Sequence, residues 1–173
     1  YAAAFGGFNH FIFSEDNSVL VEPLPINKKI EYFVSNSILI WSQIERESGV
    51  ILEDQIKNIS LRTGKLIELN QLTNSFRNKI NSNEITFEEF GTFIKTGWEI
   101  KKQFSEKIVS SGVQKLEEYL ISIGLSNMKL LGAGAGGFFL VIDSENLLDK
   151  IPKEIKKIGF SISRSGVRIL SKI

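Results

Sequence analysis

Residues 129–142 have the sequence Lys-Leu-Leu-Gly-Ala-Gly-Ala-Gly-Gly-Phe-Phe-Leu-Val-Ile, in which six small residues separate two apolar runs. The run 138–142 is short, continuous and rich in aromatic and β-branched residues, which predicts a buried strand. The backbone between the runs can adopt positive φ angles and lets a ligand or another segment approach its amides. Consecutive N–H groups can bind an anion, so a phosphate-proximal loop is one interpretation. The glycine loop consists of Gly132, Ala133, Gly134, Ala135, Gly136 and Gly137.

The spacing of these glycines leaves a second interpretation open. The loop is not a phosphate loop that ends in Gly-Lys-Ser/Thr, because Phe138 follows the last glycine. Gly132, Gly134 and Gly137 have the G-x-G-x-x-G spacing, but they precede a strand where a dinucleotide-binding loop precedes a helix. The alternative is a glycine-rich corner at which two strands meet and a helix packs closely.

Composition excludes several classes of site. The chain has 173 residues, enough for one domain with a real core, and its net charge of +1 does not favour binding to nucleic acid or to an anionic membrane. It contains no cysteine, so disulfides and a cysteine nucleophile are excluded. No apolar run approaches the roughly 20 residues that span a bilayer. We therefore expect a cytoplasmic protein that binds neither membrane nor nucleic acid.

The order of predicted elements indicates an α+β fold. Turn residues at 14–18 separate two strands of a hairpin, and Ile38–Trp41 forms the next apolar run. Three helical stretches and then a fourth that ends at Gly124 follow, and Thr86 with Glu89 forms a capping box at the start of the third, whose apolar face continues to residue 108. After the strands around the glycine loop, 152–157 predicts a last helix and 160–163 a closing strand. This order is that of a ferredoxin-like split βαβ sheet with extra helices inserted.

The beginning of the chain predicts a fragment. Ala2-Ala3-Ala4-Phe5 has the character of a helix end, and the glycines at 6 and 7 are typical of its stop. We expect residues 1–26 to be the remnant of an N-terminal domain, with the hairpin included, and 27–173 to be the C-terminal domain. Loss of the partner half predicts an exposed apolar patch and leaves a homo-oligomer open.

Four segments together resemble the GHMP small-molecule kinases. Residues 129–138 are similar to their third motif, Lys-x-x-Gly-Ala-Gly-Gly-Gly-Gly, with Ala135 where the motif has glycine. Residues 1–7, 98–102 and 165–169 resemble the heptose 7-phosphate kinase branch. The resemblance covers essentially the whole chain. It implies a C-terminal half that takes part in transfer of the ATP γ-phosphate, with Mg²⁺, to the anomeric hydroxyl of a heptose 7-phosphate.

The same resemblance implies that this chain alone is inactive. In the family the main phosphate loop and the catalytic aspartate lie in the N-terminal half, and the aspartate would fall just before Tyr1. ATP and Mg²⁺ would be bound mainly by that half. Ala135 also puts the activity of the complete protein in question. An alanine at a position with positive φ destabilises the loop conformation by about 1 kcal/mol relative to the glycine of the motif.

The candidate substrate-binding residues are Arg46, Trp98 and Lys101. Arg46 follows a predicted strand end and would pair with a phosphate, whereas an exposed arginine is the alternative. The resemblance places Trp98 and Lys101 near the sugar, whereas a tryptophan on an apolar helix face is usually core. His10, the only histidine, is expected to be structural, since neither an orienting partner nor a nucleophile is evident.

A rival function comes from a different class. Ferredoxin-like domains also serve as non-catalytic modules that bind small metabolites, and the fold by itself cannot separate the two. An Asp-Gln directly upstream of Tyr1 in the gene would favour the kinase, and its absence would favour the module.

Overall fold

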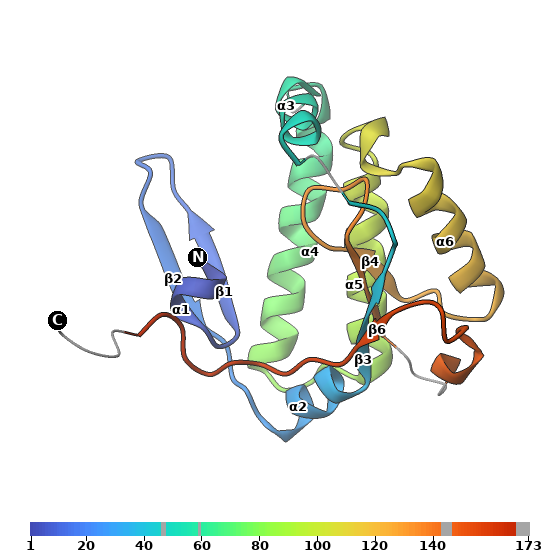
Figure 1. Cartoon of the computed structure of the whole chain (residues 1–173). Helices are drawn as coiled ribbons and strands as arrows, with labels where there is room; N and C mark the ends of the chain where they lie inside the picture. The colour runs from blue at the N-terminus through green and yellow to red at the C-terminus, as the bar shows by residue number, and fades with distance from the viewer. Residues whose placement is uncertain (46–47, 59, 143–146, 169–173) are drawn as a thin grey trace, which may run out of the picture.

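The computed structural model describes residues 1–45, 48–58, 60–142 and 147–168. Along the chain, short helix α1 and a hairpin precede a mixed helical and sheet region (Figure 1). The strands are β1 Asn9–Phe13, β2 Val19–Pro23, β3 Ser37–Trp41, β4 Met128–Leu130, β5 Phe138–Ile142 and β6 Lys157–Ile158. The α-helices are α1 Ala2–Phe5, α2 Lys28–Ser35, α3 Ser48–Asn58, α4 Thr63–Asn81, α5 Phe87–Lys102 and α6 Ser111–Ser122. The 3-10 turns are η1 Ser60–Arg62, η2 Glu106–Ile108 and η3 Leu147–Lys150.

The main sheet has four strands in the order β4-β5-β3-β6, and each neighbouring pair is antiparallel. β3 lies inside the sheet, with Ile40 opposite Phe139 of β5. Side chains alternate between the two faces of a strand, so Ile40, Phe139 and Leu130 share one face, and all three are fully buried. The predicted α+β class is confirmed, as are the strands on either side of the glycine loop.

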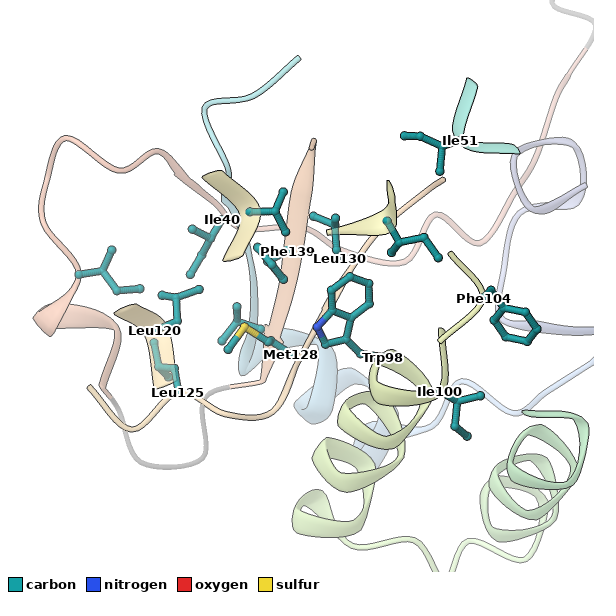
Figure 2. Close-up of a cluster of buried hydrophobic side chains, with 14 residues drawn as sticks. Ile40, Ile51, Trp98, Ile100, Phe104, Leu120, Leu125, Met128, Leu130 and Phe139 are labelled. Atoms are coloured by element: carbon teal, nitrogen blue, oxygen red, sulfur yellow. The ribbon is translucent and has the colours of Figure 1, made fainter. Parts of the chain in front are cut away.

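Helices α5 and α6 cover this buried face. Trp98 of α5 lies at the centre of the cluster, where its ring meets Phe139 edge-on at 6.0 Å between centroids (Figure 2). Its indole N–H donates to Oε1 of Glu117 on α6, 2.9 Å away, so the one polar atom of the ring is satisfied. An aromatic side chain that is 1% exposed, with its N–H paired, is a core residue.

The helix boundaries follow the local signals of the sequence. Thr86 and Glu89 form the expected capping box at the start of α5, and Gly124 has φ +100° just after α6. α5 ends at Lys102, earlier than its apolar pattern predicted, and Ile108 lies in the separate turn η2. Helix α2 was not predicted, because Pro23 and Pro25 just before it favour extended or turn structure. Its N-cap is Asn27, whose side chain accepts from the Ile30 amide.

Two predictions about the C-terminal region are wrong. Residues 152–156 form turns instead of a helix, because the chain between Ile151 and Lys157 is too short for one and must reach the edge of the sheet. The closing strand is the two-residue β6, and 160–163 pairs with no strand of the described residues. Residues 160–163 instead run back across the molecule toward α1 (Figure 1).

The hairpin forms a second, smaller sheet. β1 and β2 pair antiparallel from Asn9 opposite Pro23 to Phe13 opposite Val19, as predicted. It stands beside α4, on the side away from the main sheet (Figure 1). A second cluster of buried residues connects the hairpin region to α2 and α4. It includes Leu24 and Phe33, and Phe8 and Phe76 pack against it.

Candidate functional site

The glycine loop connects the edge strand β4 to β5 and is held by its carbonyl groups. Lys101 Nζ of α5 donates to the carbonyl of Gly132, and Gln55 Nε2 of α3 donates to that of Ala133 at 2.9 Å. Ser110, the N-cap of α6, donates to the carbonyl of Ala135 at 3.0 Å. Side chains associated with three different helices therefore fix the path of the loop.

The C-terminal part of the loop is packed into the protein. The Ala135 amide donates to the carbonyl of Ile108 at 2.7 Å, and the Gly137 amide to that of Ile44 at 3.0 Å. A Cβ at Gly134 would lie 2.9 Å from Cα of Ile108, and one at Gly136 would lie 2.6 Å from the carbonyl oxygen of Ile44. These two glycines are required by close backbone approach, which is what the corner interpretation predicts.

The N-terminal end of the loop is different. Gly132 is exposed, with φ +76°, and Ala133 is half-buried. The amides of Gly132, Ala133 and Gly134 have no acceptor among the residues that the structure describes. Consecutive amides without an internal partner can form a site for an anion. The phosphate interpretation is thus restricted to this end of the loop.

Ala135 adopts the strained conformation expected of it. Its φ is +59°, in the left-handed region that favours glycine, while its methyl group packs against the main core. Because its amide and carbonyl are both hydrogen-bonded, the surrounding structure holds the residue in place.

The predicted substrate residues on α5 have mainly structural contacts. Trp98 is buried in the main core, so its ring has no open surface for a sugar. Lys101 lies at the surface of α5, with its Nζ bonded to the loop and 5.9 Å from the Trp98 ring centroid. Lys102 on the next position pairs with Glu117 and Glu99 at 2.8 Å each. Arg46 lies outside the described residues.

The pKa shifts of Lys102 and Lys129 have opposite directions. Burial alone would lower the pKa of Lys102, but its hydrogen bonds to Glu117 and Glu99 outweigh that effect and raise it. Lys129, the first residue of the quoted stretch, has a lowered pKa because of burial. It has no hydrogen-bond or ion-pair partner within the described ranges, and a Cβ at Gly97 would lie 3.8 Å from its Nζ. Within the described residues, Lys129 thus has no partner that would offset the effect of burial on its ammonium group.

A cavity of about 710 Å³ lies between the hairpin and α4. One wall is the β1 strand, and the other is about two and a half turns of α4, which contribute both leucines and polar residues. The lining residues are His10, Phe11, Ile12, Phe13, Leu66, Leu69, Asn70, Thr73 and Asn74. Sequence reasoning missed this cavity, although Asn70, Thr73 and Asn74 have the i, i+3, i+4 spacing that places residues on one helix face.

A charged cluster joins the hairpin to α4 and includes His10, which also lines this cavity. Arg77 of α4 holds Glu22 of β2 through two hydrogen bonds of 2.7 and 3.0 Å, and His10 Nδ1 lies 3.2 Å from the same carboxylate. The Arg77 hydrogen bonds lower the pKa of Glu22. The expectation that His10 is structural agrees with this contact, which joins the hairpin to α4.

Metal ligands are sparse in this region. Within the described ranges, no group of three or more His, Cys, Asp or Glu side chains could hold a metal ion. The donor set around the glycine loop, backbone carbonyls and lysine, does not fit Mg²⁺, which takes carboxylate, phosphate and water oxygens. No helix in the described part of the chain has both the length and the apolarity needed to cross a membrane.

The sequence and the fold of the chain were compared with those of known proteins. No protein-family model matches the chain. The D-glycero-alpha-D-manno-heptose 7-phosphate kinase of Campylobacter jejuni is 32% identical over 178 residues, which cover 97% of this chain and 51% of that protein. A solved structure from Campylobacter jejuni, described as a sugar kinase, is 26% identical with a TM-score of 0.67 and covers 97% of this chain and 49% of its own. The chain thus spans about half the length of the curated relative that it matches.

A more distant structure supports the fold alone. L. major mevalonate kinase, solved with R-mevalonate, has a TM-score of 0.63 at 13% identity and covers 86% of this chain and 44% of that one. In sequence and fold the chain is similar to the C-terminal half of GHMP-type kinases, so the resemblance to these kinases is confirmed. Within this class, its curated relative is a heptose 7-phosphate kinase.

Proposed function

We propose that the chain is the C-terminal part of an ATP-dependent sugar kinase that phosphorylates the anomeric hydroxyl of a heptose 7-phosphate. The observation that carries this proposal is the match along 97% of the chain to a heptose 7-phosphate kinase, with the glycine loop included. Phosphoryl transfer depends mostly on positioning and electrostatic stabilisation. The backbone amides of the glycine loop could therefore contribute by binding a phosphate group.

The Gly132–Gly134 amides are the part of the loop that we assign to phosphate. Lys101 serves as a positioning residue, because its bonds to the carbonyls of Leu130 and Gly132 fix the direction in which those amides point. Trp98 supports Lys101 from the core instead of touching the sugar. We retain Arg46 as a candidate for pairing with the sugar phosphate.

The cavity between the hairpin and α4 is our candidate for the sugar acceptor. Its volume of about 710 Å³ is within the range of small-molecule sites, and it combines aromatic side chains with amides and a hydroxyl. Hydroxyl-rich ligands are bound by such combinations of flat apolar surface and directional polar groups.

The remaining parts of the active site belong, in this proposal, to residues outside 1–173. They are the catalytic aspartate, the main phosphate loop and the ligands of Mg²⁺. Residues 1–26 would complete the domain that carries them, and 27–173 would be a ferredoxin-like domain whose second crossover is the short segment around η3. ATP bound there would supply the phosphoryl group, and the chain alone would be inactive.

The test is an ATP-consumption assay with heptose 7-phosphate on the complete gene product and on residues 1–173. Turnover is expected from the complete protein and none from residues 1–173. Lys101→Met should reduce kcat by roughly tenfold or more, because a loosened loop misplaces the phosphate amides. Lys95→Met is the matched control, since Lys95 is an exposed lysine on the same helix.

Three results would contradict parts of this proposal. Turnover by residues 1–173 alone would show that catalysis does not need another half. Wild-type kinetics in Lys101→Met would remove Lys101 from the site. A complete gene product with no Asp-Gln before Tyr1 and no turnover would favour a non-catalytic module that binds a small metabolite.

A further inference from the structure

The chain after β6 forms a strap that returns to the N-terminus. We define the C-terminal strap as residues 160–168, which leave the main sheet and cross below α4 to reach α1 (Figure 1). Two backbone hydrogen bonds join it to the beginning of the chain. The Gly7 amide donates to the carbonyl of Ser163 at 2.6 Å, and the Val167 amide donates to that of Ala4 at 3.1 Å.

Between these bonds the two backbones touch. A Cβ at Gly166 would lie 1.9 Å from the carbonyl oxygen of Ala4, and a Cβ at Gly6 would lie 2.3 Å from the carbonyl carbon of Ser165. Neither distance is compatible with a side chain, and the obstructing atoms are backbone that cannot rotate away. The contact therefore depends on glycine at both positions, which are 160 residues apart in sequence.

Side chains in the middle of the strap contact other parts of the protein. Ile162 packs against the second buried cluster, and Arg164 forms an ion pair with Glu31 of α2. Its start is continuous with β6, which pairs with β3 in the main sheet. A movement of the strap would thus have to break contacts with α2 as well as with α1.

Helix α1 is held from a second side by the hairpin. The Tyr1 ring contacts the rings of Phe11 and Phe13, at 5.9 and 5.5 Å between centroids. With four residues and no buried side chain, α1 has little to hold it in place by itself. Its position depends on the hairpin on one side and on the strap on the other.

We infer that Gly6 and Gly166 are positioning residues, and that the strap sets the position of α1, and so of the Asp-Gln pair expected just before Tyr1, relative to the glycine loop. This inference rests on the proposed function, in which the catalytic aspartate belongs to an Asp-Gln pair just before Tyr1. Such a residue must be held to within about an ångström of its productive position, since larger displacements cost roughly a hundredfold in rate. The strap provides this constraint from the opposite end of the chain.

The experiment compares Gly166→Ala with Gly159→Ala in the complete gene product. Both substitutions add one methyl group near the strap, but a Cβ at Gly159 meets no atom within 4 Å. Hydrogen exchange of the segments 1–8 and 160–168 and steady-state kinetics are measured on both. In Gly166→Ala the Gly7 and Val167 amides should exchange at least about tenfold faster, whereas buried sheet amides stay protected.

The kinetic readout separates positioning from general loss of structure. In Gly166→Ala, kcat should fall by roughly tenfold to a hundredfold, with KM for ATP within about twofold of wild type. Gly159→Ala should match wild type in both measurements. Arg164→Glu is a milder second variant, because it replaces the attraction to Glu31 by repulsion at an exposed site. It should give the same changes with smaller amplitude if Gly166→Ala fails to fold.

Three outcomes overturn the inference or part of it. Equal exchange in Gly166→Ala and Gly159→Ala would show that the strap does not hold α1. Faster exchange with unchanged kcat would show that it holds α1 without positioning the reaction. A wild-type protein with no turnover would refute the proposed function and the catalytic role of the strap, while the exchange result would still decide whether the strap holds α1.

Discussion

The main sheet and the hairpin are both antiparallel, but they differ in how they are stabilised. In the main sheet Ile40, Leu130 and Phe139 are fully buried under α5 and α6. In the hairpin no strand residue is buried, and Phe13 and Leu20 are 66% and 60% exposed. One region completes its own core. The other presents apolar side chains to solvent and is joined to the rest at a few points.

The difference indicates which region requires a partner. A two-stranded hairpin is marginally stable by itself, and its open edges and apolar face can pair with another segment. The exposed apolar patch expected from the sequence is present on α1 and the hairpin, where Tyr1 and Phe5 are also more than half exposed. This is the surface on which the proposed N-terminal half would pack.

The largest effect that tests this comparison is expected in the main core. Trp98→Ala should reduce the free energy of unfolding by about 3–5 kcal/mol, because it empties the centre of the cluster and leaves the buried Glu117 without its indole donor. Leu20→Ala in the hairpin should change it by less than about 0.5 kcal/mol. Urea unfolding followed by circular dichroism measures both. Similar losses in the two variants would show that the hairpin shares the main core.

A smaller effect is expected inside the glycine loop. Ala135→Gly should raise the free energy of unfolding by up to about 1 kcal/mol, because glycine adopts φ +59° without strain. Ala133→Gly is the matched control, since the φ of Ala133 is not positive. It should destabilise by about 0.5–1 kcal/mol through the added freedom of the unfolded chain. A loss of stability in both variants would mean that the Ala135 methyl contributes more by packing than it costs in strain.

The smallest effect concerns the link between the hairpin and α4. The pKa of Glu22 is lowered from its ordinary value of 4.5 by the hydrogen bonds from Arg77, so the link stabilises the folded protein above that value. Its contribution is lost as the pH falls through the lowered, folded-state pKa, so the hairpin amides facing α4 should shift in NMR spectra only at a pH below 4.5. Glu22→Gln should abolish this transition.

A second carboxylate on the hairpin provides the control. Asp16 in the turn also has a lowered pKa, because of its hydrogen bonds with Ser18. Asp16→Asn should remove shifts at the tip and leave those facing α4 in place. If Asp16→Asn and Glu22→Gln have the same effect, the Glu22–Arg77 pair is not the link.

Much of the local structure could be predicted from sequence because its causes are local. Thr86 and Glu89 lie three residues apart and cap α5, and Gly124 ends α6. The predictions failed where a partner distant in sequence decides the conformation. Residues 157–158 are a strand because Ile40 and Leu39 offer a free edge, and 152–156 cannot form a helix while reaching it.

The sequence by itself determined the α+β class, the hairpin, the strands around the glycine loop and the kinase resemblance, since caps, periodicities and motifs are properties of neighbouring residues. Only the tertiary structure decided the roles of the loop glycines, of Trp98 and of Lys101. Gly134 and Gly136 are packed against Ile108 and Ile44, whereas Gly132 stays open. Trp98 lies in the core and Lys101 holds the loop. These roles depend on which backbones come together across long stretches of chain, and packing settles that only when the whole fold is formed.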